Sequence, residues 1–209
     1  MSPRETKDLI LRQALLFFSK NDFERSSLND IAGAIGVTKG AIYHYFDGKD
    51  DLFRACVVHL LDTMRQWSSE AVPMDIPLRV LLQNLFDLNA TTAGLAQAIG
   101  LGLDESGYKN VLYLFLTAIK KYPDIQLRIN EIYVRFEETL LGSIQRAIAT
   151  GEIRPDTDAE ALSFEVTAFI EGALLIGSIS SNDSYFAFSA RVFEALWNRI
   201  AIQGGTRDR

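Results

Sequence analysis

Apolar side chains recur at helical spacing along most of this chain of 209 residues. This spacing is the pattern of amphipathic helices, and no segment sustains the strict alternation of a half-buried strand. One face of a first helix, expected over about residues 4–20, carries the apolar residues Leu9, Ile10, Ala14, Phe17 and Phe18. Only five prolines are present to interrupt such helices. The sequence therefore predicts an all-α protein.

Helix-breaking residues divide the remainder of the chain. Breaks are expected at residues 72–75, between Gly100 and Gly107, and at Tyr122–Asp124. The helices expected between these breaks include residues 28–35, a short helix opening after Thr38, and about 49–67, 125–149, 158–180 and 185–202. The last residues, 204–209, are expected to be disordered.

Residues 26–52 contain the most informative arrangement in the chain. Ser27 and Asp30 are spaced as a capping box that opens a helix. Gly36 stands where the chain must turn sharply, which favours a residue without a Cβ atom, and Thr38 can cap a second helix. The apolar residues spaced to form a core between these helices are Ile31, Ala32, Ile35, Val37 and Ile42. The pattern is that of a helix-turn-helix.

The exposed side of the second helix carries residues suited to nucleic acid. These residues, named the recognition face, are Thr38, Lys39, Gly40, Tyr43 and His44. The lysine supplies charge for a phosphate, the glycine permits close backbone approach, and the aromatic pair can reach base edges. Lys49, at the start of the next helix, is placed to clamp a neighbouring phosphate. A structural corner between packed helices is the alternative, but these side chains favour DNA binding in the major groove.

Charge is distributed unevenly along the chain. Residues 1–50 contain as many basic as acidic side chains, so residues 51–209 carry the whole net charge of −6. A neutral reading domain makes few phosphate contacts, so its affinity must depend on base contacts and on the use of two copies. Charge therefore permits DNA binding without itself indicating it.

Composition and motifs exclude several classes of protein. Cys56 is the only cysteine, so no intrachain disulfide can form and a reducing cytoplasm is expected. The N-terminus does not have the pattern of a signal peptide, and the least polar stretch, residues 161–180, contains two glutamates, so no membrane span is expected. No catalytic triad, paired carboxylates or phosphate-binding glycine loop stands at a recognisable spacing. We therefore predict no enzyme activity, no cofactor and no metal site.

The region around the motif resembles the DNA-binding domain of the TetR family of bacterial transcriptional regulators. The resemblance covers about residues 8–53 and rests on Ile10, Leu11, Phe17, Phe18, Phe23, Ser27, Ile31, Ala32, Gly36, Val37, Thr38, Gly40, Tyr43, Phe46, Lys49 and Leu52. It implies operator contacts by Ser27, Thr38, Lys39, Gly40, Tyr43, His44 and Lys49. Two positions depart from the family pattern, since Asp22 replaces the usual glycine and Tyr45 the usual histidine. With His44 one place earlier, either His44 or Tyr45 is a candidate for the polar contact.

The resemblance also implies two domains. Residues 1–48 would bind DNA, and residues 49–209 would form a helical effector-binding and dimerisation domain, with a bridging helix at about 49–67. Dimer contacts are expected from the helices at about 158–202, which are apolar over more than one face. The residues expected at this interface are Phe164, Phe169, Leu174, Phe193, Leu196 and Trp197. The alternative is that these helices pack only within the monomer.

Aromatic residues between positions 55 and 150 are candidates for an effector pocket. They are Trp67, Phe86, Tyr108, Tyr113, Phe115, Tyr133 and Phe136. As a set they favour an apolar or aromatic effector, although any one of them can simply be core. Three glutamates in apolar surroundings, Glu137, Glu165 and Glu171, are candidates to receive a cation.

Together these inferences predict a ligand-responsive transcriptional regulator. As a repressor it would bind a palindromic double-stranded DNA operator as a homodimer, with recognition helices ~34–36 Å apart. A small effector beside the bridging helix would swing that helix and release the DNA. The alternative is a DNA-bound chromosome-organising or division regulator whose C-terminal domain meets a protein partner. The protein would act in the cytoplasm and have no membrane partner.

Overall fold

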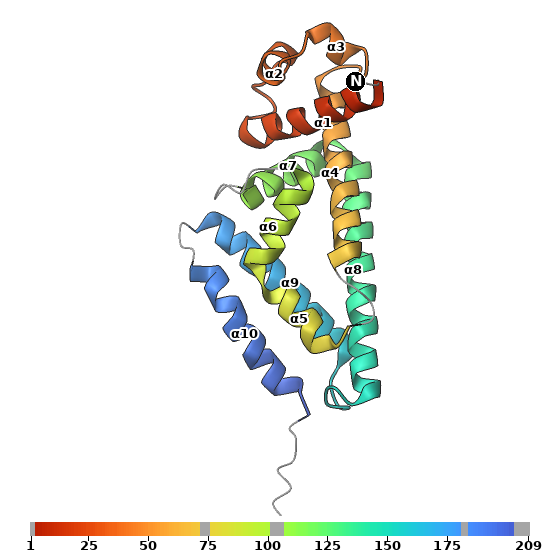
Figure 1. Cartoon of the computed structure of the whole chain (residues 1–209), viewed down its shortest axis with the longest axis vertical. Coiled ribbons are helices and arrows are strands. Elements are labelled where there is room, and N and C mark those ends of the chain that lie inside the picture. Colours follow the sequence, from red (N-terminus) through yellow and green to blue (C-terminus); the bar gives the residue numbers. More distant parts are fainter. Residues whose placement is uncertain (1–2, 72–75, 101–106, 181–183, 203–209) are drawn as a thin grey trace, which may run out of the picture. The chain divides into compact units, whose positions relative to one another are not determined.

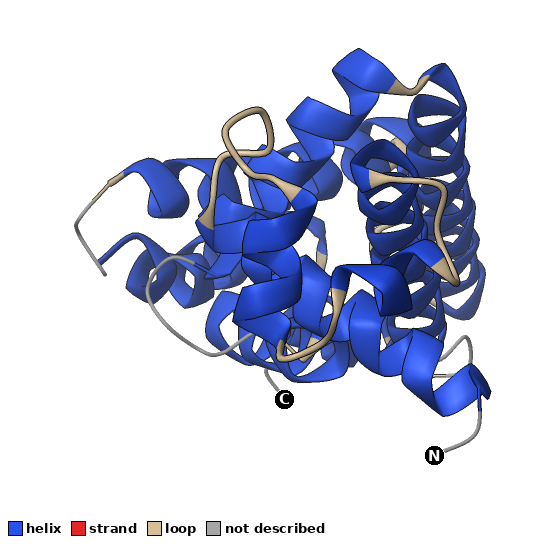
Figure 2. Ribbon diagram, turned by 90° about the horizontal axis from the view of Figure 1, so that it is seen from above, coloured by secondary structure: helices blue, strands red, loops and turns tan. Residues whose placement is uncertain are grey.

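The structure is a computed structural model and describes residues 3–71, 76–100, 107–180 and 184–202. These residues form ten helices: α1 (Pro3–Lys20), α2 (Leu28–Ile35), α3 (Lys39–Tyr43), α4 (Lys49–Ala71), α5 (Leu78–Phe86), α6 (Leu88–Ile99), α7 (Gly107–Lys121), α8 (Pro123–Thr150), α9 (Ala159–Ile179) and α10 (Ser184–Ile200). No strand forms in these ranges, where helices are joined by loops and Ile153 makes an isolated bridge with Ala201 (Figure 2). The predicted all-α fold is confirmed.

The predicted helix boundaries agree closely with the structure, with two differences. The helix after the motif extends four residues beyond the expected end at Trp67. Pro123 begins α8 instead of lying in a loop, because a proline at the first helical position lacks only an N–H that would have no helical partner. Between residues 76 and 100, where no boundary is predicted from the sequence, Asp87 separates α5 from α6 and its Oδ1 accepts the N–H of Ala90 at 3.0 Å. The predictions for residues 72–75, 101–106 and 204–209 lie outside the described residues.

Residues 1–67 and 95–131 form one compact unit, named unit 1. It contains α1 to α3, most of α4, the end of α6, α7 and the start of α8, and α1 lies against α7 (Figure 1). The Phe53 ring of α4 lies 5.0 Å from that of Phe18 and 4.6 Å from that of Phe23. All three side chains are at most 1% exposed. The helices of the expected DNA-binding domain therefore share one core with α4.

Residues 68–94 and 132–209 form unit 2. In its described part, α10 packs against both α5 and α9 (Figure 1). The Phe86 ring of α5 stacks on Phe169 of α9 at 4.7 Å and lies 5.9 Å from Phe193 of α10. Glu152, which follows α8, accepts hydrogen bonds of 3.0 and 2.9 Å from the N–H groups of the first two residues of α5. These contacts hold α5, α9 and α10 together.

Candidate nucleic-acid interface

The first helix of the motif, α2, begins at a complete capping box. Ser27 Oγ accepts the backbone N–H of Asp30 at 3.2 Å, and Asp30 Oδ2 accepts the backbone N–H of Ser27 at 2.8 Å. The Ser27 hydroxyl also donates to Asp30 Oδ2 at 2.6 Å. These bonds, the hydroxyl first, hold the pKa of Asp30 below its usual range because they stabilise the charged carboxylate. The predicted capping box is confirmed.

Gly36 makes the turn between α2 and α3. Its φ of 73° and ψ of 27° lie in the left-handed region, which is costly for residues with a Cβ atom. The N–H groups of Gly36 and Val37 both donate to the carbonyl of Ala32. Thr38 Oγ1 then accepts the N–H of Ala41 at 3.1 Å and caps α3. The predicted turn at Gly36 and the predicted helix cap at Thr38 are both confirmed.

Apolar residues join α2 to α3 and thereby orient the second helix. Those buried between the helices are Ile31, Ala32 and Ile42, with exposed fractions of 0%, 4% and 0%. Ile35 and Val37, which are expected in the same core, are only half-buried. Ile42 points into this core, whereas the next residue along α3, Tyr43, is 52% exposed.

All five residues of the recognition face are exposed, and so is Ser27. The Lys39 ammonium lies 5.7 Å from the centre of the Tyr43 ring. A Cβ atom added to Gly40 would meet only Thr38 Oγ1, at 3.8 Å, so the backbone at Gly40 is open to the outside. Six of the seven residues implied as operator contacts are therefore accessible in the structure.

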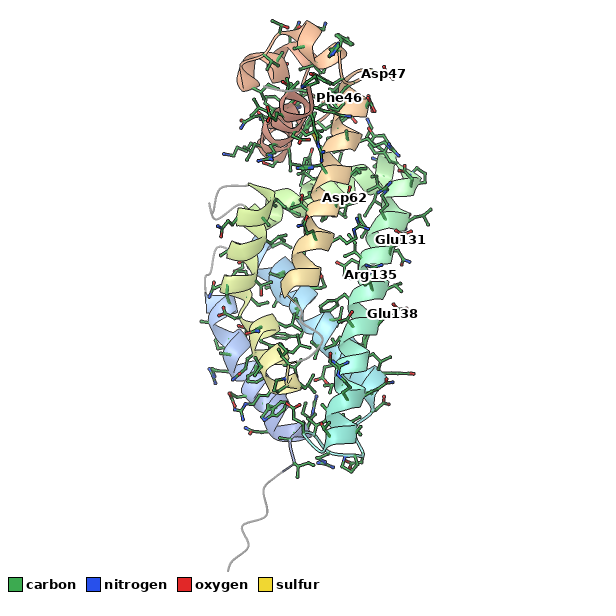
Figure 3. The ribbon with its side chains drawn as sticks, turned by 45° about the vertical axis from the view of Figure 1, so that its right-hand side comes forward. Phe46, Asp47, Asp62, Glu131, Arg135 and Glu138 are labelled. Atoms are coloured by element: carbon green, nitrogen blue, oxygen red, sulfur yellow. The ribbon has the colours of Figure 1, made fainter. Side chains whose placement is uncertain are left out.

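The histidine that stands one place earlier than in the family pattern is the accessible one. His44 is exposed and Tyr45 is half-buried, with their rings edge to face at 4.7 Å. Beyond them, Phe46 points among the helices of the motif and is 3% exposed, whereas Asp47 points outward (Figure 3). Between the two candidates for the polar contact, the structure therefore presents His44.

Lys49, the seventh residue, is held by the protein itself. Its Nζ donates to the backbone carbonyls of Phe23 at 2.8 Å and Ser26 at 2.9 Å, and lies 4.4 Å from the centre of the Phe23 ring. An ammonium group has three N–H donors, so one remains for another acceptor. The geometry supports a structural role for Lys49 in addition to the expected phosphate contact. Sequence does not reveal it, because backbone carbonyls 23 and 26 residues away carry no residue-specific signal.

The aromatic residues expected in the effector pocket lie in two different parts of the structure. Phe86 is 2% exposed and stacked within the core of unit 2, so in this structure it presents little surface to a ligand. Four others are divided between the units, Tyr113 and Phe115 in unit 1 and Tyr133 and Phe136 in unit 2. The two tyrosines are 40% and 39% exposed, and the two phenylalanines are half-buried. The side chains of Trp67 and Tyr108 lie outside the described part of the structure.

Four of the six residues expected at the dimer interface are buried within unit 2. Four of them are between 3% and 7% exposed: Leu174, Phe193, Leu196 and Trp197. Phe169 stacks on Phe86. The four buried side chains have little surface left to lose to a second protomer, whereas Phe169 is half-buried and Phe164 is 71% exposed. The large apolar side chains that α9 and α10 do expose are Phe164, Leu175, Ile176, Ile179, Phe188 and Val192.

The described ranges contain no group of three His, Cys, Asp or Glu side chains able to hold a metal ion. In the same ranges, no helix has the length and apolar character to span a membrane. Cys56 is buried, its thiol donates to the carbonyl of Leu11 at 3.5 Å, and burial raises its pKa far above the usual value. The thiol is therefore unreactive at neutral pH.

Two capped helices, joined at a left-handed glycine and exposing a polar face on the second, define a helix-turn-helix DNA-binding protein. The family model of bacterial regulatory proteins, tetR family, matches residues 10–56, and that of a tetracyclin repressor-like C-terminal domain matches residues 120–193. The chain belongs to the TetR family of bacterial transcriptional regulators. Because that family consists of regulators, the prediction that the protein is not an enzyme is confirmed.

Individual relatives are similar over different lengths. AcrR of Shigella flexneri is 50% identical over 50 residues, which are 24% of this chain and 23% of that protein. The repressor KstR2 of Rhodococcus jostii is 23% identical over 152 residues, 72% of this chain and 69% of that protein. TtgR of Pseudomonas putida is 24% identical over 179 residues, 82% of this chain and 79% of that protein. The chain thus matches less than a quarter of the AcrR relative's length.

Solved structures share the fold over nearly the whole chain. A TetR-family regulator from Cytophaga hutchinsonii has a TM-score of 0.74 at 21% identity, covering 98% of this chain and 99% of that one. A regulator from Saccharomonospora viridis, solved in complex with choline, has a TM-score of 0.74 at 19% identity, covering 96% of this chain and 100% of that one. At these identities the likeness concerns the fold alone.

Proposed function

We propose that this regulator represses transcription by binding a palindromic operator as a homodimer, and that a small apolar or aromatic effector releases it. The observation that carries the proposal is the recognition face, five exposed residues on a helix whose apolar side is buried. The similarity of the chain to the repressor KstR2 of Rhodococcus jostii supports repression of transcription. The protein acts in the cytoplasm, where it meets chromosomal DNA.

Six exposed residues contact the operator in this proposal: Ser27, Thr38, Lys39, Gly40, Tyr43 and His44. The two hydroxyls and the lysine ammonium suit phosphate oxygens, which fix the register of the protein on the duplex. The tyrosine and the histidine, one helical turn later, suit base edges in the major groove. Lys49 contributes indirectly by holding the turn that precedes α2, with one N–H still available to a phosphate.

The contacts are tested by measuring binding to the DNA upstream of the encoding gene over a series of salt concentrations. Lys39→Ala is expected to weaken binding and to reduce the slope of log affinity against log salt by about one, because one phosphate contact is lost. Lys120→Ala removes an exposed lysine of α7 and serves as the matched control, with both quantities unchanged. An unchanged slope in Lys39→Ala would remove that residue from the interface. Absence of salt-dependent binding by the unaltered protein would refute the proposal.

The homodimer is supported by exposed apolar side chains on two adjacent helices. α9 and α10 pack together and expose six large apolar residues, with exposed fractions from 37% to 74%. Covering such side chains is favourable, and two copies joined through these helices form a four-helix bundle. A two-fold dimer also has the symmetry of a palindromic operator.

Light scattering at micromolar concentration tests the dimer. The unaltered protein is expected to be dimeric, and Ile179→Asp, at a position 74% exposed in the protomer, is expected to make it monomeric because a charge would be buried at the interface. Leu127→Asp is the control, since Leu127 of α8 is 66% exposed in unit 1, away from both dimer helices along the chain. A monomeric unaltered protein, or equal effects of the two substitutions, would contradict the proposed interface.

Effector binding is assigned to the accessible aromatic residues. In unit 2, burial raises the pKa of Tyr133, and the negative charge and hydrogen bonding of Glu171 raise it further. A tyrosine beside a carboxylate also suits an organic cation, and the similar protein from Saccharomonospora viridis binds choline. Glu165 of α9, another of the glutamates that are candidates to receive a cation, pairs with Arg199 of α10. Organic cations are therefore the second class of compound to test.

Calorimetric titration with neutral aromatic compounds and with quaternary ammonium compounds separates the two classes. A neutral aromatic is expected to bind and to weaken operator affinity about tenfold or more, a coupling of ~1.4 kcal/mol. Glu171→Gln should leave that binding intact and abolish only binding of a cation. A compound that binds tightly and leaves operator affinity unchanged would exclude release by that effector.

The continuous helix α4 supports a route for the coupling. It runs without interruption from Lys49 to Ala71, so it begins in unit 1 and ends in unit 2. An effector that tilts this helix would change the spacing of two recognition helices in a dimer, which a palindromic operator does not tolerate. A two-proline interruption of α4 is expected to abolish the effector response while leaving effector binding measurable.

A further inference from the structure

The α1–α2 turn, residues 22–26, sets where the helix-turn-helix begins. Asp22 closes this turn, since its Oδ1 accepts the N–H of Glu24 at 2.8 Å and its carbonyl accepts the N–H of Ser26 at 3.1 Å. The next residue, Ser27, both caps α2 and belongs to the proposed DNA contacts. A displacement of the turn therefore displaces the start of α2.

Two lysine ammonium groups hold the α1–α2 turn, and one of them comes from outside the motif. Lys49 binds two backbone carbonyls of the turn. Lys121, the last residue of α7, places its Nζ 4.1 Å from the centre of the Phe23 ring. The same Nζ lies 3.0 Å from Asp50 Oδ1 and 3.6 Å from Glu24 Oε1. Lys121 thus connects the turn to the first residues of α4.

Neighbouring residues at the end of α7 and the start of α8 reinforce this contact. The Tyr122 hydroxyl donates to Asp50 Oδ1 at 3.0 Å, and Arg54 pairs with Asp124 at 2.5 Å. The Lys121 ammonium holds the pKa of Asp50 below its usual range, and burial raises the pKa of Tyr122. The α7–α8 corner, residues 121–124, therefore contacts both the α1–α2 turn and the start of α4.

The setting of Lys121 differs from that of an ordinary surface ion pair. An exposed pair contributes little, because water screens the charges and two long side chains must be ordered. The side chain of Lys121 is only 26% exposed, and its ammonium meets an aromatic face as well as two carboxylates. Phe23 keeps its contacts with Phe18 and Phe53 when the ammonium is removed, so the core should persist while the turn loosens.

We propose that Lys121 is a positioning residue for operator binding. It does not touch DNA but holds the α1–α2 turn, and with it Ser27 and the recognition face, in the geometry that binds the operator. This inference rests on the operator binding proposed above. If so, operator affinity also depends on the α7–α8 corner, a segment far beyond the motif in the sequence.

Lys121→Met tests the proposal, because it keeps the aliphatic stem and removes the ammonium. Lys120→Met removes the adjacent, exposed lysine of the same helix and is the matched control. Hydrogen–deuterium exchange of a peptide covering residues 22–30 reports on the turn without DNA. Operator affinity is measured over a salt series, together with affinity for unrelated DNA and the melting temperature.

In Lys121→Met, exchange of the 22–30 peptide should accelerate and operator affinity should fall about three- to tenfold, the loss expected from one cation–aromatic contact and its ion pairs. The salt slope and the affinity for unrelated DNA should stay as in the unaltered protein. Lys121→Arg should restore both exchange and affinity, and Lys120→Met should change neither. A salt slope reduced by about one would show that Lys121 binds a phosphate itself and would overturn the proposal. Unchanged exchange would overturn it as well.

A second variant guards against unfolding of Lys121→Met. Glu24→Gln combined with Asp50→Asn removes the two carboxylate partners and keeps the lysine, and it should reproduce the faster exchange and the weaker operator binding. Failure to do so counts against the positioning role. If the unaltered protein binds no operator, the proposed function fails, whereas the exchange measurement still decides whether Lys121 holds the turn.

Discussion

Gly33 and Gly36 should respond to the same substitution with opposite changes in stability. Gly33 lies inside α2, and Gly36 ends that helix with a φ of +73°. A Cβ atom added at either position would meet no atom within 4 Å. Packing is therefore equivalent at the two sites, and the backbone conformation alone distinguishes them.

The expected magnitudes follow from that conformation. Gly33→Ala should raise the free energy of unfolding by about 0.5–1 kcal/mol, because alanine loses less backbone entropy in a helix interior. Gly36→Ala should lower it by about 1–2 kcal/mol, because a Cβ atom is crowded in the left-handed region. A chain of this size shifts its melting temperature by roughly 2–4 °C for each kcal/mol, so the two variants should differ by several degrees.

Urea and thermal denaturation followed by far-UV circular dichroism measure the difference. Gly36→Asn is the control, because asparagine tolerates the left-handed region better than alanine and should fall between alanine and glycine. If Gly36→Ala were as stable as the unaltered protein, or if the order of the two alanine variants were reversed, the turn would not depend on the left-handed conformation. The argument for glycine at this position would then be refuted.

Three further outcomes are expected. Lys49→Met should lower the free energy of unfolding by about 2–3 kcal/mol in urea titrations, because two carbonyls lose a charged donor, and a loss below 0.5 kcal/mol would contradict the structural role. Lys121 chiefly lowers the pKa of Asp50 from its ordinary value of 3.8. The charged carboxylate therefore stabilises the folded protein above pH 3.8, and this stabilisation is lost as the pH falls through the lower pKa of the folded state. Asp50→Asn should therefore flatten the acid side of the stability-versus-pH curve, and an unchanged curve would argue against the contact. Glu152→Ala should destabilise the protein by about 1–2 kcal/mol, because the first two N–H groups of α5 lose their acceptor; equal melting temperatures would show that water replaces it.

The helix-turn-helix could be predicted almost completely from sequence. The partner of Ser27 is three residues away, the turn at Gly36 bonds back to Ala32, and Thr38 caps through Ala41. Interactions of this range depend on residue type and spacing, which are visible in the sequence itself. The exposed positions of α3 could be predicted for the same reason, because they follow from residue type and spacing within one short segment.

The inner and outer faces of α9 and α10 could not be predicted in the same way. α9 carries apolar residues around much of its circumference, so periodicity does not say which of them meet α5 and α10. The structure buries Leu174 and exposes Ile176 and Ile179 on the same helix. It likewise stacks the ring of Phe86 on that of Phe169, a contact that the spacing of the residues does not reveal.

The sequence alone determined the helices of the motif, their caps and the exposed recognition face, because each depends on neighbours within about one helical turn. The tertiary structure alone decided the partners of Lys49 and Lys121. A lysine has a long, flexible stem, and its ammonium binds any carbonyl, carboxylate or aromatic face that the fold brings within reach. The Phe23 ring and its turn meet both lysines only after α4 and α7 have packed beside them.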